Sequence, residues 1–253
     1  MRPIIGSMWT STGPGARHEK YLTLSKVWNF SARKIFKRTA TIICHDAPPF
    51  NMKTPCPSFG RGDRRIGPSK TLAWREKIRH WAKIVREAPI GTPILMTDID
   101  LAFFGNPFPE LFSDDFESFD VGLCNKCTGA VYFSGSPESH SFMDWWLLQT
   151  EELFRNPELY ESLDRTYHGL DQCSFQLAAA IQNHGAKIIE LPNRFHSTFQ
   201  HHELPAYVFH FHGKMRGMVL GTIPIENIPV PLQTYCLRWQ KMYRKIQRAT
   251  PTI

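Results

Sequence analysis

The sequence lacks an apolar run long enough to cross a membrane, and it contains no internal repeat and no low-complexity tract. Near the N-terminus only Pro3 to Gly6 is apolar, which is far too short for a signal peptide. These absences argue against an integral membrane protein, a solenoid and a disordered chain. We therefore expect a cytoplasmic globular protein whose membrane contact, if any, is peripheral.

A disulfide framework is also missing. The six cysteines stand at positions 44, 56, 124, 127, 173 and 236, without the regular spacing of a small disulfide-bonded domain. Cys124 and Cys127 form one C-x-x-C pair, but no second pair completes a zinc site. Unpaired thiols in a reducing compartment are the simpler interpretation, and a zinc or redox role for this pair remains the alternative.

The overall composition is that of a soluble globular protein. Of the 253 residues, 42% are hydrophobic and 21% are charged, and a chain of this length can bury one substantial core. The formal net charge of +7 favours partners that carry phosphate or other negative charge. This charge does not discriminate among nucleic acid, anionic lipid and nucleotide, so the motifs must decide.

Short apolar segments alternate with segments of helical periodicity along the chain. Strands are predicted at residues 4–9, 40–44, a segment ending at 98, 120–123, 130–133, 187–191 and 207–211, and helices at 19–36, 72–87, 139–154 and 170–182. Loops are predicted at 13–15 and, over a long stretch rich in proline, glycine and arginine, at 47–69. The alternation predicts an α/β fold with a mainly parallel sheet flanked by helices, as a single domain at 1–235 followed by a basic C-terminal helix or tail at 236–253.

Two carboxylates follow the apolar run that begins at Pro93. Because side chains alternate along a strand, Asp98 and Asp100 are expected to point to one face from adjacent pleats. Ligands bind beyond the carboxyl ends of the strands in such sheets, and two hard oxygen donors there are typical of a Mg²⁺ or Mn²⁺ site that also takes phosphate oxygens. Acidic pairs at strand ends also cap helices or face solvent, so this pair needs support from the rest of the chain.

A second candidate lies at residues 208–214, where phenylalanine and histidine alternate. In a strand, His210 and His212 would share a face turned toward a cleft, while the phenylalanines would face the core. A neutral imidazole suits Mn²⁺ better than Mg²⁺ as a third ligand. Gly213 would let the backbone approach a diphosphate and Lys214 would neutralise it. The alternative is an ordinary histidine pair at the surface or the core edge.

Two predicted helices supply further candidates. Asp171 and Gln172 stand at the start of one helix, where a carboxylate and an amide can bind sugar hydroxyls or stabilise positive charge at an anomeric carbon. Asp171 is otherwise an N-terminal capping or first-turn residue. The helix before the carboxylates carries Arg75, Lys77 and Arg79, of which one can reach a phosphate in place of solvent.

These four pieces, in this order, resemble the metal-dependent nucleotide-sugar glycosyltransferases of the A-type fold. The similarity covers residues 72–214 and is nearest to family eight, the group containing glycogenin and bacterial lipopolysaccharide galactosyltransferases. The resemblance implies a single Rossmann-like A-type domain. It also implies that Asp98, Asp100 and a histidine, either His210 or His212, hold Mn²⁺ or Mg²⁺ on the donor diphosphate.

The same resemblance assigns contacts to the donor. Lys77 is similar to a donor-binding lysine of the family, and Thr128 and Gly129 stand where the family touches the donor sugar. Asp171 and Gln172 match the Asp-Gln pair that lines the sugar pocket, and they are the predicted catalytic residues. The donor diphosphate would meet Gly213 and Lys214, and the nucleoside would be held at the ends of the first two strands by Ser7, Trp9 and Asp46.

The sequence thus predicts an enzyme that transfers a sugar from a nucleotide-diphosphate donor, expected to be a UDP-sugar, to an acceptor hydroxyl. The acceptor would be a glycan, a lipid-linked molecule or a protein, and retention of anomeric configuration is implied by the resemblance alone. Two departures affect the donor contacts. Cys127 replaces an expected asparagine, and the family's Lys-Pro-Trp after His-x-x-Gly is missing, with Lys214 as its nearest substitute.

Other functions stay open. A phosphohydrolase of the haloacid dehalogenase type also uses Asp-x-Asp after a strand, but here two predicted strands precede the motif and no later acidic pair completes it. Basic stretches at 61–65 and 238–248 permit a nucleic-acid or anionic-surface binding module, although no recognised nucleic-acid motif supports one. The second stretch predicts a helix that either packs on the domain with a solvated basic face or docks on an anionic membrane.

Overall fold

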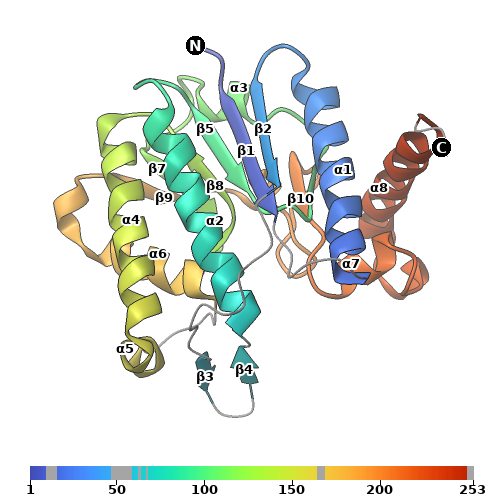
Figure 1. Cartoon of the computed structure of the whole chain (residues 1–253). Helices are drawn as coiled ribbons and strands as arrows, with labels where there is room; N and C mark the ends of the chain where they lie inside the picture. Colours follow the sequence, from blue (N-terminus) through green and yellow to red (C-terminus); the bar gives the residue numbers. More distant parts are fainter. Residues whose placement is uncertain (10–15, 47–58, 62–63, 67, 164–168, 250–253) are drawn as a thin grey trace.

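A six-stranded sheet forms the centre of the molecule, with helices on both faces (Figure 1). This computed structural model describes residues 1–9, 16–46, 59–61, 64–66, 68–163 and 169–249. The strand order is β2-β1-β5-β8-β7-β9. The bounds of these strands are β1 Ile4–Trp9, β2 Thr41–Asp46, β5 Ile94–Thr97, β7 Val121–Cys124, β8 Cys127–Phe133 and β9 Ile188–Glu190.

The sheet is mainly parallel, as the alternating pattern predicts. β1 pairs in parallel with β2 and β5, and β7 pairs in parallel with β9, whereas β8 runs antiparallel to both of its neighbours. A two-residue turn joins β7 to β8, with Asn125 and Lys126 at φ angles of 51° and 52°. Positive φ at both central residues is the conformation that reverses a twisted hairpin, so this turn sets the register of β8.

One face of the sheet is covered by α2 (Pro68–Glu87), α4 (Pro137–Arg155) and α6 (Leu170–Ala180). Trp81 of α2 and Trp146 of α4 meet edge to face at 5.9 Å between ring centroids, and Phe175 of α6 packs on Trp146 at 5.0 Å. The aromatic positions predicted from helical spacing are therefore the contacts that bury this face. The short helix α5 (Pro157–Ser162) follows α4.

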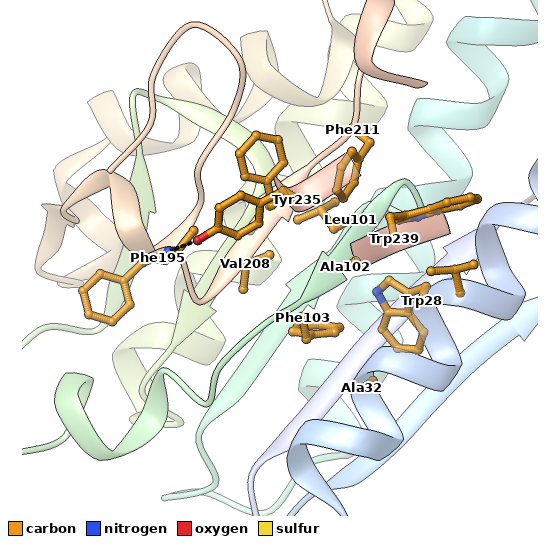
Figure 2. Close-up of a cluster of buried hydrophobic side chains, with 14 of the residues drawn as sticks. Trp28, Ala32, Leu101, Ala102, Phe103, Phe195, Val208, Phe211, Tyr235 and Trp239 are labelled. Atoms are coloured by element: carbon orange, nitrogen blue, oxygen red, sulfur yellow. Dashed lines mark hydrogen bonds between the residues drawn. The ribbon is translucent and has the colours of Figure 1, made fainter. Parts of the chain in front are cut away.

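The opposite face carries α1 (Ala16–Phe36) and a small antiparallel sheet of β6 (Leu101–Phe103) and β10 (Val208–His210). Beyond it lie α7 (Lys214–Val219) and α8 (Val230–Ala249). Figure 2 shows Trp28 of α1 and Trp239 of α8 beside the strand that carries Leu101, Ala102 and Phe103, with Phe211 near Trp239. Trp239 is 1% exposed, so the predicted basic tail is anchored in the core through one face of α8.

The predicted strands and long helices are all found, with ends that differ by a few residues. Short elements escaped prediction, because three or four residues carry no measurable periodicity: β3 Phe59–Arg61, β4 Arg64–Ile66, β6, α3 Phe108–Leu111, α5 and α7, with single helical turns at Gln182–His184, Asn193–Phe195 and Ile225–Asn227. The predicted loop at 13–15 and most of that at 47–69 lie outside the described residues. Within the described part, residues 59–61 and 64–66 form a hairpin and α2 already begins at Pro68.

The membrane question has a limited answer in the fold. None of the described helices combines the length and the apolar composition that a membrane span requires. The division of the chain at residue 236 stays a prediction, although α8 begins before it, at Val230.

Candidate functional site

The end of β5 is tied down by two buried side chains. The hydroxyl of Ser7 donates to the carbonyl oxygen of Thr97 at 2.8 Å, and the indole N–H of Trp28 donates to the Thr97 hydroxyl at 2.8 Å. The next N–H, that of Asp98, donates to the carbonyl oxygen of Gly129 at 2.7 Å. The first carboxylate therefore leaves the sheet from a fixed point, and Ser7 serves that anchoring rather than facing solvent.

The expectation that both carboxylates stand on adjacent pleats of one strand is wrong. β5 ends at Thr97 and β6 begins at Leu101, so Asp98 and Asp100 belong to the turn that connects the central sheet to the small one. Ile99 between them is 5% exposed and packs into the core. The two carboxylates still converge, because the Ile99 side chain points into the core and its two neighbours point to the opposite side of the turn.

His210 reaches the carboxylates from β10. That strand pairs antiparallel with β6 and sets His210 opposite Leu101, next to Asp100. The Nε2 atom of His210 lies 3.0 Å from Oδ1 of Asp100 and 3.9 Å from Oδ2 of Asp98. Each of the three side chains offers a ligand atom within 4.8 Å of the others.

The donor set fits a divalent metal. Two carboxylates and one imidazole can hold such an ion, and Asp98 keeps 29% of its side chain exposed, which leaves an approach to the ligand atoms. His212 is not part of this group; its ring lies 4.8 Å from that of His210. The structure thus brings His210, and not His212, to both carboxylates.

Lys77 links the carboxylate group to the predicted sugar pocket. Its ammonium donates to Asp98 at 2.9 Å and to Asp171 at 2.5 Å, and also to the backbone oxygen of Thr128 at 3.3 Å. The Thr128 hydroxyl donates to the same carboxylate oxygen of Asp171 at 2.8 Å. The single basic residue that leaves the solvated face of α2 is therefore Lys77; Arg75 and Arg79 bind Glu151 on α4 instead.

Asp171 does not cap its helix. The N-cap residue of α6 is Gly169, and the Asp171 carboxylate, in the first turn, points to Lys77. A β-carbon at Gly169 would lie 2.6 Å from Oδ1 of Asp171, so glycine makes room for this orientation. Gln172 follows as a half-buried side chain on the same turn. The structure thus excludes a capping role for Asp171, while the other half of that alternative, a position in the first turn, is where the residue lies.

The carboxylates are held by cations from three elements. Arg216 of α7 forms an ion pair with Asp100. Burial raises the pKa of Asp100, but His210 and Arg216 outweigh this effect and hold that pKa below its usual value. For Asp98 burial wins over the attraction of Lys77, so the pKa of Asp98 is raised. Burial also opposes the charge on Lys77, yet Asp171 and Asp98 raise its pKa.

His210 completes this charge balance. Three carboxylates face two permanent cations, Lys77 and Arg216, which leaves one negative charge. Although burial lowers the pKa of His210, Asp100 raises it to about 10, so the imidazole is protonated at neutral pH in the metal-free protein. A site with this balance can exchange that proton for a divalent cation and still accept a phosphate.

Other predicted residues lie around this centre. Trp9 ends β1, is 5% exposed and has its ring 5.1 Å from that of His18. Asp46 ends β2 opposite Trp9 in the register of the parallel pair. Gly213, at a φ of 57°, precedes α7, and Lys214, the first residue of that helix, is exposed.

Sequence reasoning missed two contacts of the site. Arg216 stands two residues beyond Lys214, and the turn of α7 brings Arg216 and not Lys214 to Asp100. The signal was the basic residue after Gly213, but only the helix start shows which of the two points inward. His196 contacts His210 at 3.1 Å between Nε2 and Nδ1, and it comes from a short turn at Asn193–Phe195 that carries no periodic signal.

A scan against protein-family models and a search of curated proteins found no match to the chain. Comparison with solved structures found several. The galactosyltransferase LgtC, in complex with donor and acceptor sugar analogs, shares 10% sequence identity at a TM-score of 0.53, over 99% of this chain and 97% of LgtC. A glycosyltransferase involved in glycosylation of the major capsid of PBCV-1 shares 11% identity at a TM-score of 0.54, over 87% of this chain and 100% of that one.

A third structure is the apo-form glycosyltransferase GlyE of Streptococcus pneumoniae TIGR4, with 11% identity and a TM-score of 0.53, over 98% of this chain and 63% of GlyE. Identities this low carry information on the fold alone. They agree with a mixed α/β fold in which helices flank a mostly parallel central sheet. The chain therefore has the fold of the A-type glycosyltransferases, as its motifs predict.

Proposed function

We propose that this protein is a metal-dependent glycosyltransferase, which moves a sugar from a nucleotide-diphosphate donor to an acceptor hydroxyl. The observation that carries the proposal is the continuous polar cluster from Asp98, Asp100 and His210 through Lys77 to Asp171. One end of the cluster has ligands for a metal and a diphosphate, and the other has a carboxylate for a sugar. Its fold neighbours are glycosyltransferases, and one was solved with donor and acceptor sugar analogs.

Asp98, Asp100 and His210 would hold the metal, proposed to be Mn²⁺ or Mg²⁺. When bound, such an ion acts as a Lewis acid on the diphosphate leaving group. The chain contributes permanent charge of its own. Lys77 is 7% exposed and Arg216 is partly buried against Asp100, so both cations act where water does not screen them fully.

The sugar would lie against the first turn of α6. Asp171 is fixed by Lys77 and Thr128, and a carboxylate held in that way keeps its orientation when positive charge develops at the anomeric carbon. Gln172, half-buried beside it, would bind a sugar hydroxyl. Gly129 and Gly213 would allow close approach of the donor, with the exposed Lys214 near its phosphates.

The finer assignments belong to the same proposal. The nucleoside, taken to be uridine, would lie at the ends of β1 and β2 near Trp9 and Asp46, with Ser7 supporting that edge from below. Transfer with retention follows only from the resemblance to family eight. The acceptor would be a glycan, a lipid-linked molecule or a protein.

Peripheral membrane contact through α8 is part of the proposal. The helix exposes a basic face at residues 238, 241, 244, 245 and 248, opposite the face that buries Trp239. Anionic lipid attracts such a face. Removing residues 237–253 would also remove Trp239 from the core, so reversal of the exposed charges is the better test.

The competing functions are not favoured. A phosphohydrolase needs a free aspartate as nucleophile, whereas Asp98 is bound to Lys77 and neighbours His210. The reported solved structures are glycosyltransferases, and none of them points to a basic nucleic-acid binding module.

A panel of nucleotide sugars, assayed for binding and hydrolysis with and without Mn²⁺, tests the proposal. We expect one donor, a UDP-sugar, to bind and react only with metal, and Asp100→Asn to lower turnover by about a hundredfold or more. Asp144→Asn is the matched control, because that carboxylate is exposed on α4 and pairs only with Arg86 at 2.6 Å. Equal activity without metal, or an unaffected Asp100 variant, would contradict the proposal.

A further inference from the structure

A second group of metal-binding side chains adjoins the carboxylates. Cys127 and Gly129 lie on one face of β8, and the rings of His196 and His210 stack over this face with their centroids 5.2 Å apart and their planes 26° from parallel. A β-carbon at position 129 would lie 2.7 Å from Cε1 of His210 and 3.0 Å from Cε1 of His196. Because glycine has no side chain, position 129 leaves room for both imidazoles to pack beside the Cys127 thiol.

The three side chains are close enough to bind one ion. Cys127, His196 and His210 each offer a ligand atom within 4.8 Å of the others. Nε2 of His196 and Nδ1 of His210 are 3.1 Å apart, and two nitrogens on a tetrahedral ion with bonds of about 2.0 Å are about 3.3 Å apart. Cys127 is half-buried in the hairpin end of β8.

His196 lacks a complete set of partners as it stands. It is 0% exposed, and its Nδ1 atom has no hydrogen-bond partner among the described residues. A buried polar atom without a partner costs free energy, so a buried imidazole is normally bonded at both nitrogens. The nitrogen that faces His210 is Nε2, so a ligand role for His196 rests on that contact and on the neighbouring thiol, and not on the unpartnered Nδ1.

We propose that Cys127, His196 and His210 form a site for a soft divalent cation such as Zn²⁺, and that its occupation excludes a metal from the carboxylate site. Two nitrogens and a sulfur favour such ions, whereas two carboxylates and a nitrogen favour Mn²⁺ or Mg²⁺. The site itself stands on the geometry of the three ligands. The exclusion rests on the function proposed above, because it needs His210 to serve the carboxylate site as well.

His210 faces the two sites with opposite nitrogens. Nε2 lies 3.0 Å from Asp100, and Nδ1 lies 3.1 Å from His196. A neutral imidazole has one lone pair and one N–H, so it binds one ion at a time. With an ion on Nε2, the N–H at Nδ1 donates to His196. With an ion on Nδ1, the N–H at Nε2 would donate to Asp100, and two protons, one from Nδ1 of His210 and one from the Cys127 thiol, would pass to solvent.

Co²⁺ tests the soft site directly, since a thiolate ligand gives a charge-transfer band in the near ultraviolet and a carboxylate does not. Titration of the whole chain is expected to give this band at one equivalent. The band is expected to disappear in Cys127→Ser, to persist in Asp98→Asn, and to persist in Cys44→Ser, a half-buried cysteine on β2. His196→Gln is expected to weaken Co²⁺ binding at least tenfold, and circular dichroism checks that each variant is folded.

A separate experiment tests whether an ion at the soft site excludes Mn²⁺ from the carboxylate site, by measuring the electron paramagnetic resonance of free Mn²⁺. One equivalent of Zn²⁺ is expected to release bound Mn²⁺ from the native chain, whereas the same release from Cys127→Ser is expected to need about tenfold more Zn²⁺, which then competes for the carboxylate site alone. No thiolate band in the native chain, or a band that survives Cys127→Ser, overturns the soft site. Simultaneous binding of both ions overturns the exclusion. Failure of Mn²⁺ to bind at all would refute the proposed function, while the Co²⁺ band would still report the soft site.

Discussion

Lys77→Met is the substitution for which the structure makes the sharpest prediction. The Lys77 ammonium is 9% exposed and lies between two carboxylates, at 2.9 Å from Asp98 and 2.5 Å from Asp171. Although burial opposes the charge, Asp171 and Asp98 raise the pKa of Lys77, so its side chain is fully charged at neutral pH. Its contribution to stability is therefore lost only as the pH rises through this raised pKa. Methionine keeps most of the volume and removes the charge, which leaves Asp171 buried without a cation.

The size of the effect follows from which carboxylate water can reach. Removing one partner of a buried ion pair costs about 3–5 kcal/mol. Asp98 keeps 29% of its side chain exposed and can be hydrated, whereas Asp171 keeps 6% and retains only the Thr128 hydroxyl. We therefore expect the lower end of that range, about 3 kcal/mol. In the double variant Lys77→Met with Asp171→Asn the uncompensated charge of Asp171 is removed as well, so about half of that loss should return.

Urea unfolding at pH 7 without metal measures both effects. With a slope of about 3 kcal/mol/M for a domain of this size, the midpoint should fall by about 1 M in Lys77→Met and by about half as much in the double variant. Lys83→Met is the control on the same helix, because Lys83 is 64% exposed and its ion pair with Glu87 spans 3.9 Å. A single variant as stable as Lys83→Met, or a double variant less stable than the single one, would refute the reasoning.

Three further outcomes are expected. Gly129→Ala should lower the unfolding free energy by about 1–3 kcal/mol and abolish metal binding, because the added β-carbon meets two imidazoles. Gly213→Ala, strained only by its φ of 57°, should lower it by about 1–2 kcal/mol. Calorimetry measures the stability of both variants, and a metal titration distinguishes the first from the second. Burial raises the pKa of Glu151, but two arginines of α2 outweigh burial and lower this pKa to about 2. The stabilising effect of the Glu151 carboxylate is therefore present above pH 4.5 and is lost as the pH falls toward 2. Glu151→Gln should therefore be about 1–2 kcal/mol less stable than the native chain at pH 6 and nearly equal to it at pH 2, by urea unfolding. Lys241→Glu with Lys245→Glu should at least halve binding to vesicles that contain anionic lipid and leave thermal stability unchanged, because both side chains are exposed; unchanged vesicle binding would sink the membrane proposal.

The sequence predicts those parts of the site that are carried by long periodic elements. Helical spacing puts Arg75, Lys77 and Arg79 on one helix, and only the resemblance to family eight selects Lys77 among them. Asp98 is indicated by the apolar strand that ends immediately before it. Asp171 was placed at a helix start, which is where it lies. Because ligands bind beyond the carboxyl ends of the strands in such sheets, the direction of each element along the chain also predicts which of its ends lies near the site.

What the sequence could not supply are contacts set by short or irregular segments. Whether Arg216 or Lys214 turns inward depends on where a helix of six residues starts, and the placement of His196 depends on a single helical turn. The same holds for Asp100, whose position comes from the turn between two sheets and not from strand alternation. Such segments are fixed by the pairing of β6 with β10, which joins residues about a hundred positions apart.

The metal-free arrangement explains why a carboxylate pair can be this deeply buried. Asp100 is 5% exposed, and an ion in that position is stable only when paired. In the described structure Arg216 and protonated His210 hold Asp100, while Lys77 holds Asp98. Binding of a divalent metal at His210 would release one proton, so the site would gain one net positive charge. Arg216 and Lys77, which stabilise these carboxylates, would therefore also compete with the metal for them. Weakening Arg216 or Lys77 should shift stability and metal affinity in opposite directions.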